Sequence, residues 1–228
     1  MTKNKIIFFF FAFILTACAK AQHETWGYGF TAAADEVFNT EIRFVLPDNK
    51  TELRPLSVGI SGAFLPQEIL NGYFAFRGFS GPKQSTPYPI RAYVEWVSFV
   101  DKKRYGIWLN FPTNLDFLTD ENSYISGCGK GWQMRRILNF GVAPGGYIET
   151  YVGTGCEADR VILHRNIASE VQTEYDKTVP LASQFKNRFK AFDEKNQAFI
   201  KKHSIPYWRF QLGQPPIATS RRNNNQSQ

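Results

Sequence analysis

A stretch of regular alternation between apolar and polar residues, at 89–111, constrains the fold more than any other feature of the chain. The apolar positions of its two arms are Ile90, Ala92, Val94 and Trp96, followed by Tyr105, Ile107, Leu109 and Phe111. A period of two is typical of a β-strand that buries one face. The polar residues at 101–104 separate the arms, so we expect an antiparallel hairpin with a four-residue loop.

Similar strand signals recur along the chain, bounded by glycine and proline. They lie at 26–30, 41–46, 56–60, 73–79, 137–142, 147–152, 160–164 and 207–211. The segments at 137–142 and 147–152 flank Pro144, Gly145 and Gly146. This arrangement predicts a second hairpin.

The segment at 180–203 has helical periodicity. Its apolar stripe comprises Ala182, Phe185, Phe189, Phe192 and Phe199, interrupted by Asn196. Six basic side chains against two acidic ones give the segment a charge of +4. Two interpretations remain open. The basic face meets anionic lipid or an acidic partner, or it is simply solvated while the phenylalanines pack on the sheet, which is the commoner arrangement.

Together these signals predict a single α+β domain at 31–213. We expect mostly antiparallel strands, in a hairpin-built sheet or sandwich, and one long C-terminal amphipathic helix. The 21 Phe, 10 Tyr and 5 Trp side chains can supply a substantial core, which excludes global disorder. The polar segment 214–228 predicts a disordered tail.

The N-terminus has the features of a secretion signal. Lys3 and Lys5 precede an apolar run at 6–15, which is shorter than the roughly 20 residues that span a bilayer. The residues at 15–18, Leu-Thr-Ala-Cys, match the lipobox of bacterial lipoproteins. We therefore expect a signal peptide at 1–17, lipid attachment at Cys18 and a tether at 18–30. Ala19 favours the outer membrane of a Gram-negative host, with the protein facing the periplasm.

Charge and cysteine content narrow the possible partners. Without Lys3 and Lys5 the chain keeps 25 basic and 20 acidic side chains, a net charge of +5. This favours anionic lipid or an acidic protein surface, and an exported, anchored protein is not expected to bind nucleic acid. Cys128 and Cys156 lie in glycine-rich stretches. Export permits a disulfide between them, and two separate thiols remain the alternative.

Residue patterns typical of enzymes and metal sites are weak. His23, His164 and His203 are isolated from other metal-ligating residues, so neither a metal nor another cofactor is expected. The glycine-rich stretch around Lys130 lacks the Ser or Thr of a phosphate loop. Ser61, between Gly59 and Ala63, resembles a hydrolase nucleophile elbow, but a glycine turn between strands is the preferred interpretation.

The two hairpins carry a resemblance to a known family. The segments at 88–90, 94–99 and 111–112, together with Tyr105 and the Asn-Phe-Gly-Val-Ala-Pro-Gly-Gly segment at 139–146, resemble the bacterial lipoprotein family called domain of unknown function 2931. The likeness covers about 88–165 and the lipobox. It implies no catalytic residues. It does imply an immunity protein that binds and inhibits a phospholipase effector of a type VI secretion system.

We therefore expect a protein-binding, non-enzymatic lipoprotein with a lipase effector as its partner. An envelope-maintenance lipoprotein is the alternative, and an esterase built on Ser61 is a third hypothesis. Exposed loops of the hairpins are natural places for binding residues. We expect such residues in two segments, at 101–104 and 127–136, with Arg104, Trp132, Arg135 and Arg136 as the candidates.

Overall fold

The computed structural model describes residues 26–55, 59–61, 81, 86–112, 124–125, 129–130, 135–154 and 160–213. Several predictions fall on other parts of the chain and lie outside the described residues. They concern the signal peptide, the lipid site Cys18, the cysteine pair Cys128 and Cys156, Trp132, the strand at 73–79 and the tail at 214–228.

The larger sheet is built around the predicted hairpin. Strands β5 (Arg91–Ser98) and β6 (Lys103–Asn110) pair along their full length, with Tyr93 opposite Trp108. The strand order is β12-β6-β5-β2-β3, where β2 is Val37–Val45, β3 is Glu52–Leu53 and β12 is Ser169–Glu170. β4 (Gly59–Ser61) also pairs with β2. All these pairs are antiparallel.

The second sheet contains the second predicted hairpin. β9 (Ile137–Ala143) and β10 (Tyr147–Gly153) flank a single 3-10 turn, η1 (Pro144–Gly146). β11 (Val161–Ile167) extends the sheet beside β10, and β1 (Gly27–Ala32) lies parallel to β9. A separate short pair joins β7 (Tyr124–Ile125) to β8 (Gly129–Lys130). Because β1 starts at Gly27 and Trp26 is buried, the domain begins earlier than residue 31 and the expected tether is shorter.

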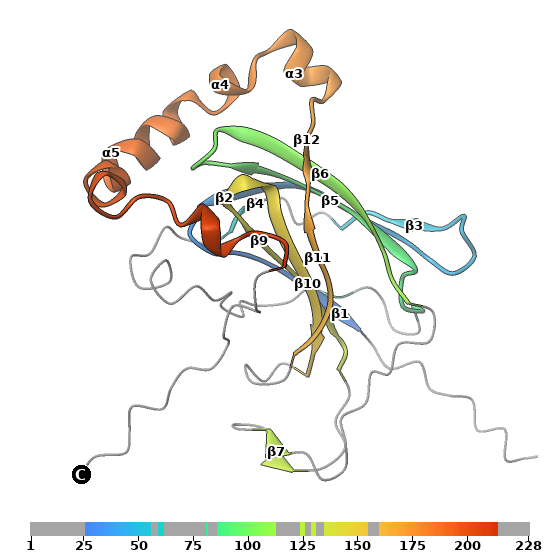
Figure 1. Cartoon of the computed structure of the whole chain (residues 1–228). Coiled ribbons are helices and arrows are strands. Elements are labelled where there is room, and N and C mark those ends of the chain that lie inside the picture. Colours follow the sequence, from blue (N-terminus) through green and yellow to red (C-terminus); the bar gives the residue numbers. More distant parts are fainter. Residues whose placement is uncertain are drawn as a thin grey trace, which may run out of the picture.

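The main core lies between the two sheets, which cross each other in Figure 1. Ala92, Val94 and Trp96 of β5 are completely buried, as their alternation predicts. Rings from both sheets meet there: Phe44 of β2 lies 6.1 Å from Phe140 of β9 between centroids. β11 runs directly toward β12, so the chain crosses from one sheet to the other at this edge.

The C-terminal segment forms several helical pieces that arch over the larger sheet in Figure 1. They are α3 (Glu174–Thr178), α4 (Leu181–Gln184), α5 (Lys186–His203) and the 3-10 turn η2 (Tyr207–Arg209). Phe185, Phe189 and Phe192 pack with Phe99 in a second core cluster, as the helical stripe predicts. The prediction of a strand at 207–211 is wrong. Tyr207 instead begins the 3-10 turn η2, and its hydroxyl donates a hydrogen bond to Asp101 Oδ1 (2.7 Å).

The α+β prediction, with mostly antiparallel strands and a long C-terminal helix, is confirmed. The predicted position of the first hairpin loop, 101–104, is wrong by two residues. The turn occupies 99–102, and Arg104 belongs to β6. Buried Asp35 explains the shift, because it accepts the backbone N–H groups of Phe99 and Val100 and the hydroxyl of Ser98. The N–H of Val100 is thereby satisfied by a side chain and not by a strand partner.

Asp35 generates a stability prediction that depends on pH. Burial raises the pKa of Asp35 well above its usual value, despite its hydrogen bonds. The folded state therefore binds the proton of the Asp35 carboxyl more tightly than the unfolded chain does. The stability that this proton contributes falls as the pH rises from about 4, the pKa in the unfolded chain, toward the folded-state pKa. Asp35→Asn keeps the shape and removes the titration. We expect urea unfolding to show that the wild type loses stability relative to the Asp35→Asn variant over this range. A constant difference between the two would contradict the account.

Candidate binding surface

The residues proposed from sequence for binding occupy different environments. Arg104 is only 6% exposed, so the prediction that it lies in an exposed loop is wrong. Arg135 is half-buried and Arg136 is exposed, just before β9. Trp132, their predicted companion, lies outside the described residues. The structure therefore leaves Arg136 as the exposed member of the described candidates.

Ser61 and His164, the residues of the esterase hypothesis, belong to different sheets. Ser61 ends β4, where it pairs with Val37 of β2. His164 lies on β11, and its Nε2 contacts the backbone carbonyl of Asn110 at the end of β6. Because β5 lies between β6 and β2, the histidine approaches the larger sheet on a different strand from the one that pairs with Ser61.

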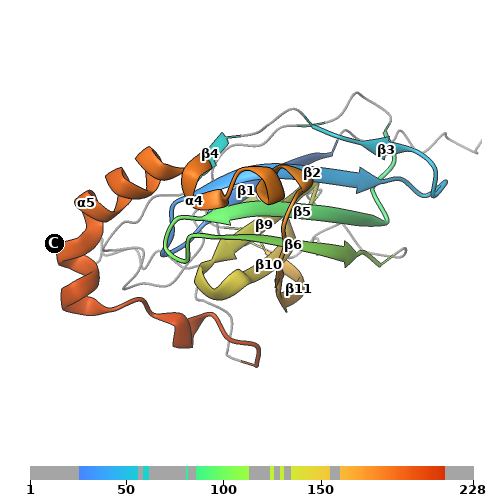
Figure 2. The ribbon, with the colours of Figure 1, turned by 90° about the horizontal axis from the view of Figure 1, so that it is seen from above.

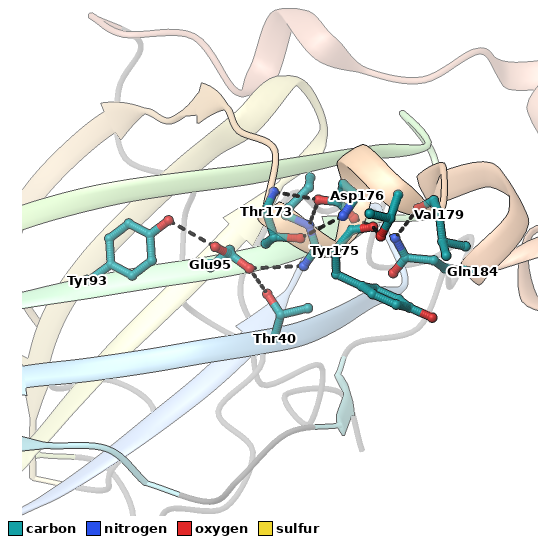
Figure 3. A network of polar contacts seen from close by, with 10 residues as sticks. Thr40, Tyr93, Glu95, Thr173, Tyr175, Asp176, Val179 and Gln184 are labelled. Atoms are coloured by element: carbon teal, nitrogen blue, oxygen red, sulfur yellow. Dashed lines mark hydrogen bonds and ion pairs between the residues drawn. The ribbon is translucent and has the colours of Figure 1, made fainter.

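A buried ion network lies on the outer face of the larger sheet, beneath α3 (Figure 3). The Arg104 guanidinium binds Asp176 with two parallel hydrogen bonds, from Nε to Oδ2 (2.8 Å) and from NH2 to Oδ1 (3.0 Å). Its NH1 donates to Glu95 Oε1 at 2.9 Å. The three side chains are between 5% and 9% exposed. One arginine thus joins β5, β6 and α3 through two carboxylates.

Both carboxylates of the network have further donors. Thr40 donates to Glu95 Oε1 (2.7 Å), and Tyr93 donates to Glu95 Oε2 (3.0 Å). Asp176 accepts the amide of Gln184 at 2.6 Å and caps its own helix through the backbone N–H of Thr173. Because every carboxylate oxygen already accepts a hydrogen bond, this network is suited to holding structure together. It does not resemble a pair of carboxylates poised for acid–base chemistry.

Beside this network, on the same face, lies a row of arginines and aromatic rings, which we call the arginine–aromatic ladder: Arg43, Tyr93, Trp108 and Arg91. Arg43 and Tyr93 are partly buried, and Arg91 and Trp108 are exposed. Strand register places Arg43 opposite Tyr93 and Tyr93 opposite Trp108. The Arg43 guanidinium carbon lies 4.7 Å from the Tyr93 ring centroid and 5.3 Å from that of Trp108. Arg91 lies 4.7 Å from the Trp108 centroid. Trp108 is 42% exposed.

The ladder is held in a fixed geometry by its neighbours. The Tyr93 and Trp108 rings lie 5.3 Å apart, and Glu41 lies 2.9 Å from Arg43 Nε. Gly106 leaves room for the tyrosine, since a Cβ there would lie 2.5 Å from the Tyr93 hydroxyl oxygen. Burial, together with the nearby Glu95 carboxylate, raises the pKa of Tyr93 to about 12. Tyr93 therefore stays a neutral hydrogen-bond donor and connects the ladder to the ion network.

The prediction from sequence missed this surface because it placed the binding residues in loops. The signal was present in the alternation itself: Arg91 and Tyr93 occupy the polar face of the predicted strand. Figure 2 shows that the helices cover one end of the larger sheet, whereas the end next to β3 has no helix over it among the described residues. The ladder lies on this uncovered part of the face, on strands β2, β5 and β6.

A second surface follows α5. Lys186, Lys190 and Lys201 line a groove whose apolar floor includes Phe189 and Ile200. The interpretation that the phenylalanine stripe packs on the fold is confirmed for its buried members. Binding of lipid or protein by the basic face stays a prediction.

Within the described ranges, no group of three or more potential ligands could hold a metal ion. In that same part of the chain, none of the helices has the length and apolar character needed to cross a bilayer.

The ion network generates a prediction about stability. Arg104→Ala leaves Glu95 and Asp176 buried without their shared cation. We expect it to lower the free energy of unfolding by about 3–5 kcal/mol. Lys102→Ala is the matched control, since its pair with Asp193 is about half exposed and should contribute less than about 1 kcal/mol. Chemical denaturation of both variants provides the measurement. Equal effects would show that the buried network is not a principal stabilising element.

Asp176 makes the same network sensitive to acid. Burial acts to raise its pKa, but hydrogen bonds from Arg104, Thr173 and Gln184 outweigh it and hold the pKa at about 2. The resulting stability is present above the unfolded pKa and is lost as the pH falls through about 2. It amounts to about 2 kcal/mol. In Asp176→Asn this acid-dependent loss should disappear, while stability at neutral pH is lower. Denaturation series between pH 2 and pH 6 would test this, and an unchanged acid dependence in the variant would count against it.

Comparison with known proteins places the chain in a family. No curated protein and no solved structure matches it significantly. A family described as "Protein of unknown function (DUF2931)" matches residues 17–207. The match extends well beyond the hairpins that suggested the resemblance and includes α3 to α5. The chain therefore belongs to the DUF2931 family.

Proposed function

We propose that this chain is a lipid-anchored binding protein that faces the periplasm and inhibits a cognate type VI secretion phospholipase effector by covering it. The lipobox at Cys18 supports the anchor, and Ala19 supports outer-membrane placement. The nature of the partner follows from the resemblance to immunity lipoproteins. The arginine–aromatic ladder is the main structural support for a binding function.

The composition of the ladder suits a protein interface. Trp, Tyr and Arg dominate the residues whose truncation costs most at protein–protein contacts. Here Trp108 is exposed, and the cations of Arg43 and Arg91 lie against the aromatic rings. Such pre-positioned side chains lose little conformational freedom when a partner binds. The ladder can therefore provide a rigid contact surface for a partner protein, a role that requires no catalysis.

The internal contacts of three acidic residues, Glu95, Asp176 and Asp101, also favour binding. Glu95 and Asp176 share Arg104, as described above. Asp101 accepts hydroxyls from Tyr105 and Tyr207 and the backbone N–H of Gly145. These carboxylates serve to join elements of the fold. Occlusion of an enzyme requires a stable, complementary surface, which such a scaffold supplies.

The proposal predicts that Trp108 is an energetic anchor. Trp108→Ala should weaken binding to the lipase effector, which the resemblance implies is encoded beside the gene, by about 2 kcal/mol or more, roughly a thirtyfold rise in Kd. Trp208→Ala is the matched control, because Trp208 is 62% exposed but lies on η2, outside the ladder. Its Kd should stay unchanged. Calorimetry with the Cys18→Ser protein supplies the affinities, and thermal unfolding verifies that both variants remain folded.

Two outcomes would contradict the proposal. If the neighbouring gene product does not bind the protein, inhibition of a lipase effector is rejected, and an envelope-maintenance role replaces it. If binding occurs but Trp108→Ala and Trp208→Ala weaken it equally, the ladder is not the interface. Survival of cells that export the lipase to the periplasm gives the corresponding cellular measurement.

A further inference from the structure

We infer that the arginine–aromatic ladder meets its partner at the membrane surface, and that this partner is an acidic protein bound to the bilayer. The inference deepens the proposed function and rests on it. The position of the anchor and the charge of the surface both point to this one kind of partner.

The starting point is Trp26, where the described domain begins after the cysteine. Trp26 is 1% exposed, and its ring nitrogen donates to the carbonyls of Thr86 and Pro87 at 3.1 Å. Its ring lies 5.1 Å from that of Phe44. These contacts fix the entry of the chain firmly to one place on the sandwich.

That place lies beneath the ladder. Phe44 points into the core and is opposite Ala92, while the adjacent Arg43 is on the outer face opposite Tyr93. Successive residues of a strand project to opposite faces. Trp26 and the ladder therefore lie on the two sides of the same stretch of β2. Facing sheets are spaced about 10 Å apart and the outer side chains add roughly half as much, so about 15 Å separates Trp26 from the ladder.

The length of the tether then limits the distance to the bilayer. Cys18 and Trp26 are eight residues apart, and eight residues reach at most about 28 Å in any conformation. With this separation added, the ladder lies within about 45 Å of the lipid that holds the anchor. A partner in contact with the ladder is thus close enough to touch the bilayer.

Trp208, the other exposed tryptophan among the described residues, lies at the opposite end of the larger sheet. Tyr207, the neighbour of Trp208, donates to Asp101 in the turn that follows Ser98 at the end of β5. From Tyr93 to that turn the strand covers at least about 17 Å. Trp208 therefore provides a reference point that is farther than Trp108 from Trp26, where the anchored chain enters the described domain.

The charge and geometry of the ladder favour an acidic protein over the lipid itself. Among the described residues, Arg91 lies against the Trp108 ring and forms no ion pair with an acidic side chain. Its guanidinium can donate two parallel hydrogen bonds to a carboxylate. Both Arg43 and Arg91 lie over the Trp108 ring, so an acyl chain would have to displace cations to reach it. Acidic side chains can bind the ladder without this displacement.

The first experiment tests orientation and needs no partner. The mature lipidated protein is placed in phosphatidylethanolamine–phosphatidylglycerol vesicles that contain a dansyl-labelled lipid, and energy transfer from tryptophan is measured. We expect Trp108→Phe to remove more of the transfer than Trp208→Phe. An equal or larger loss with Trp208→Phe would overturn the inference even if the proposed function holds.

The second experiment tests whether the bilayer is the meeting place. Cys18→Ser protein, exported behind an ordinary cleavable signal, should bind the lipase effector with an unchanged Kd. At equal periplasmic amounts it should protect cells about tenfold less or worse, because anchoring raises the local concentration. Equal protection by the anchored and unanchored forms would overturn the inference, whereas loss of binding in solution would instead count against the proposed function.

The third experiment separates protein from lipid as the occupant. The Cys18→Ser protein is sedimented with the same vesicles in the absence of the lipase. We expect it to remain in the supernatant. Sedimentation that is abolished by Trp108→Ala would overturn the inference, because the ladder would then be a lipid-binding surface.

Discussion

The guanidinium of Arg104, held between Glu95 and Asp176, is the interaction on which the outer face of the larger sheet depends. Its planar shape permits two hydrogen bonds to one carboxylate and a third to the other, which a lysine cannot reproduce. Desolvating these charges is costly, so removal of any one member is expected to be severe. The network fastens α3 to β6 and, through Glu95, fixes the hydroxyl of Tyr93. The covering helices and the exposed ladder therefore share one structural support.

This arrangement divides the face into two parts with different properties. Beneath α3, polar groups satisfy one another and water is largely excluded, as the exposures of 5–9% indicate. Toward β3, Arg91 and Trp108 remain exposed. Tyr93 belongs to both parts, since its hydroxyl donates to Glu95 while its ring packs against Trp108. A partner that binds the ladder would thus contact side chains already immobilised from below, which favours affinity.

The sequence predicted the parts of this fold that depend on local pattern. Alternation identified the first hairpin and the buried face of β5. The Pro-Gly-Gly segment between two strand signals identified the second hairpin, and the phenylalanine stripe identified α5. It failed where a distant residue determines the local geometry. Asp35 shifts the hairpin loop by binding Phe99 and Val100, and Asp101 holds Tyr207 in a turn rather than a strand. The ladder was missed because binding residues were expected in loops, whereas its residues come from three strands that pairing brings together.

Oxidative footprinting of the protein alone and in complex with the lipase effector tests the central claim most directly, that the ladder is the binding surface. Trp108 and Trp208 are both exposed, and both are therefore expected to react in the unbound protein. The account predicts that binding strongly slows oxidation of Trp108 and leaves that of Trp208 unchanged. Oxidation of Trp108 at its unbound rate in a saturated complex would contradict it.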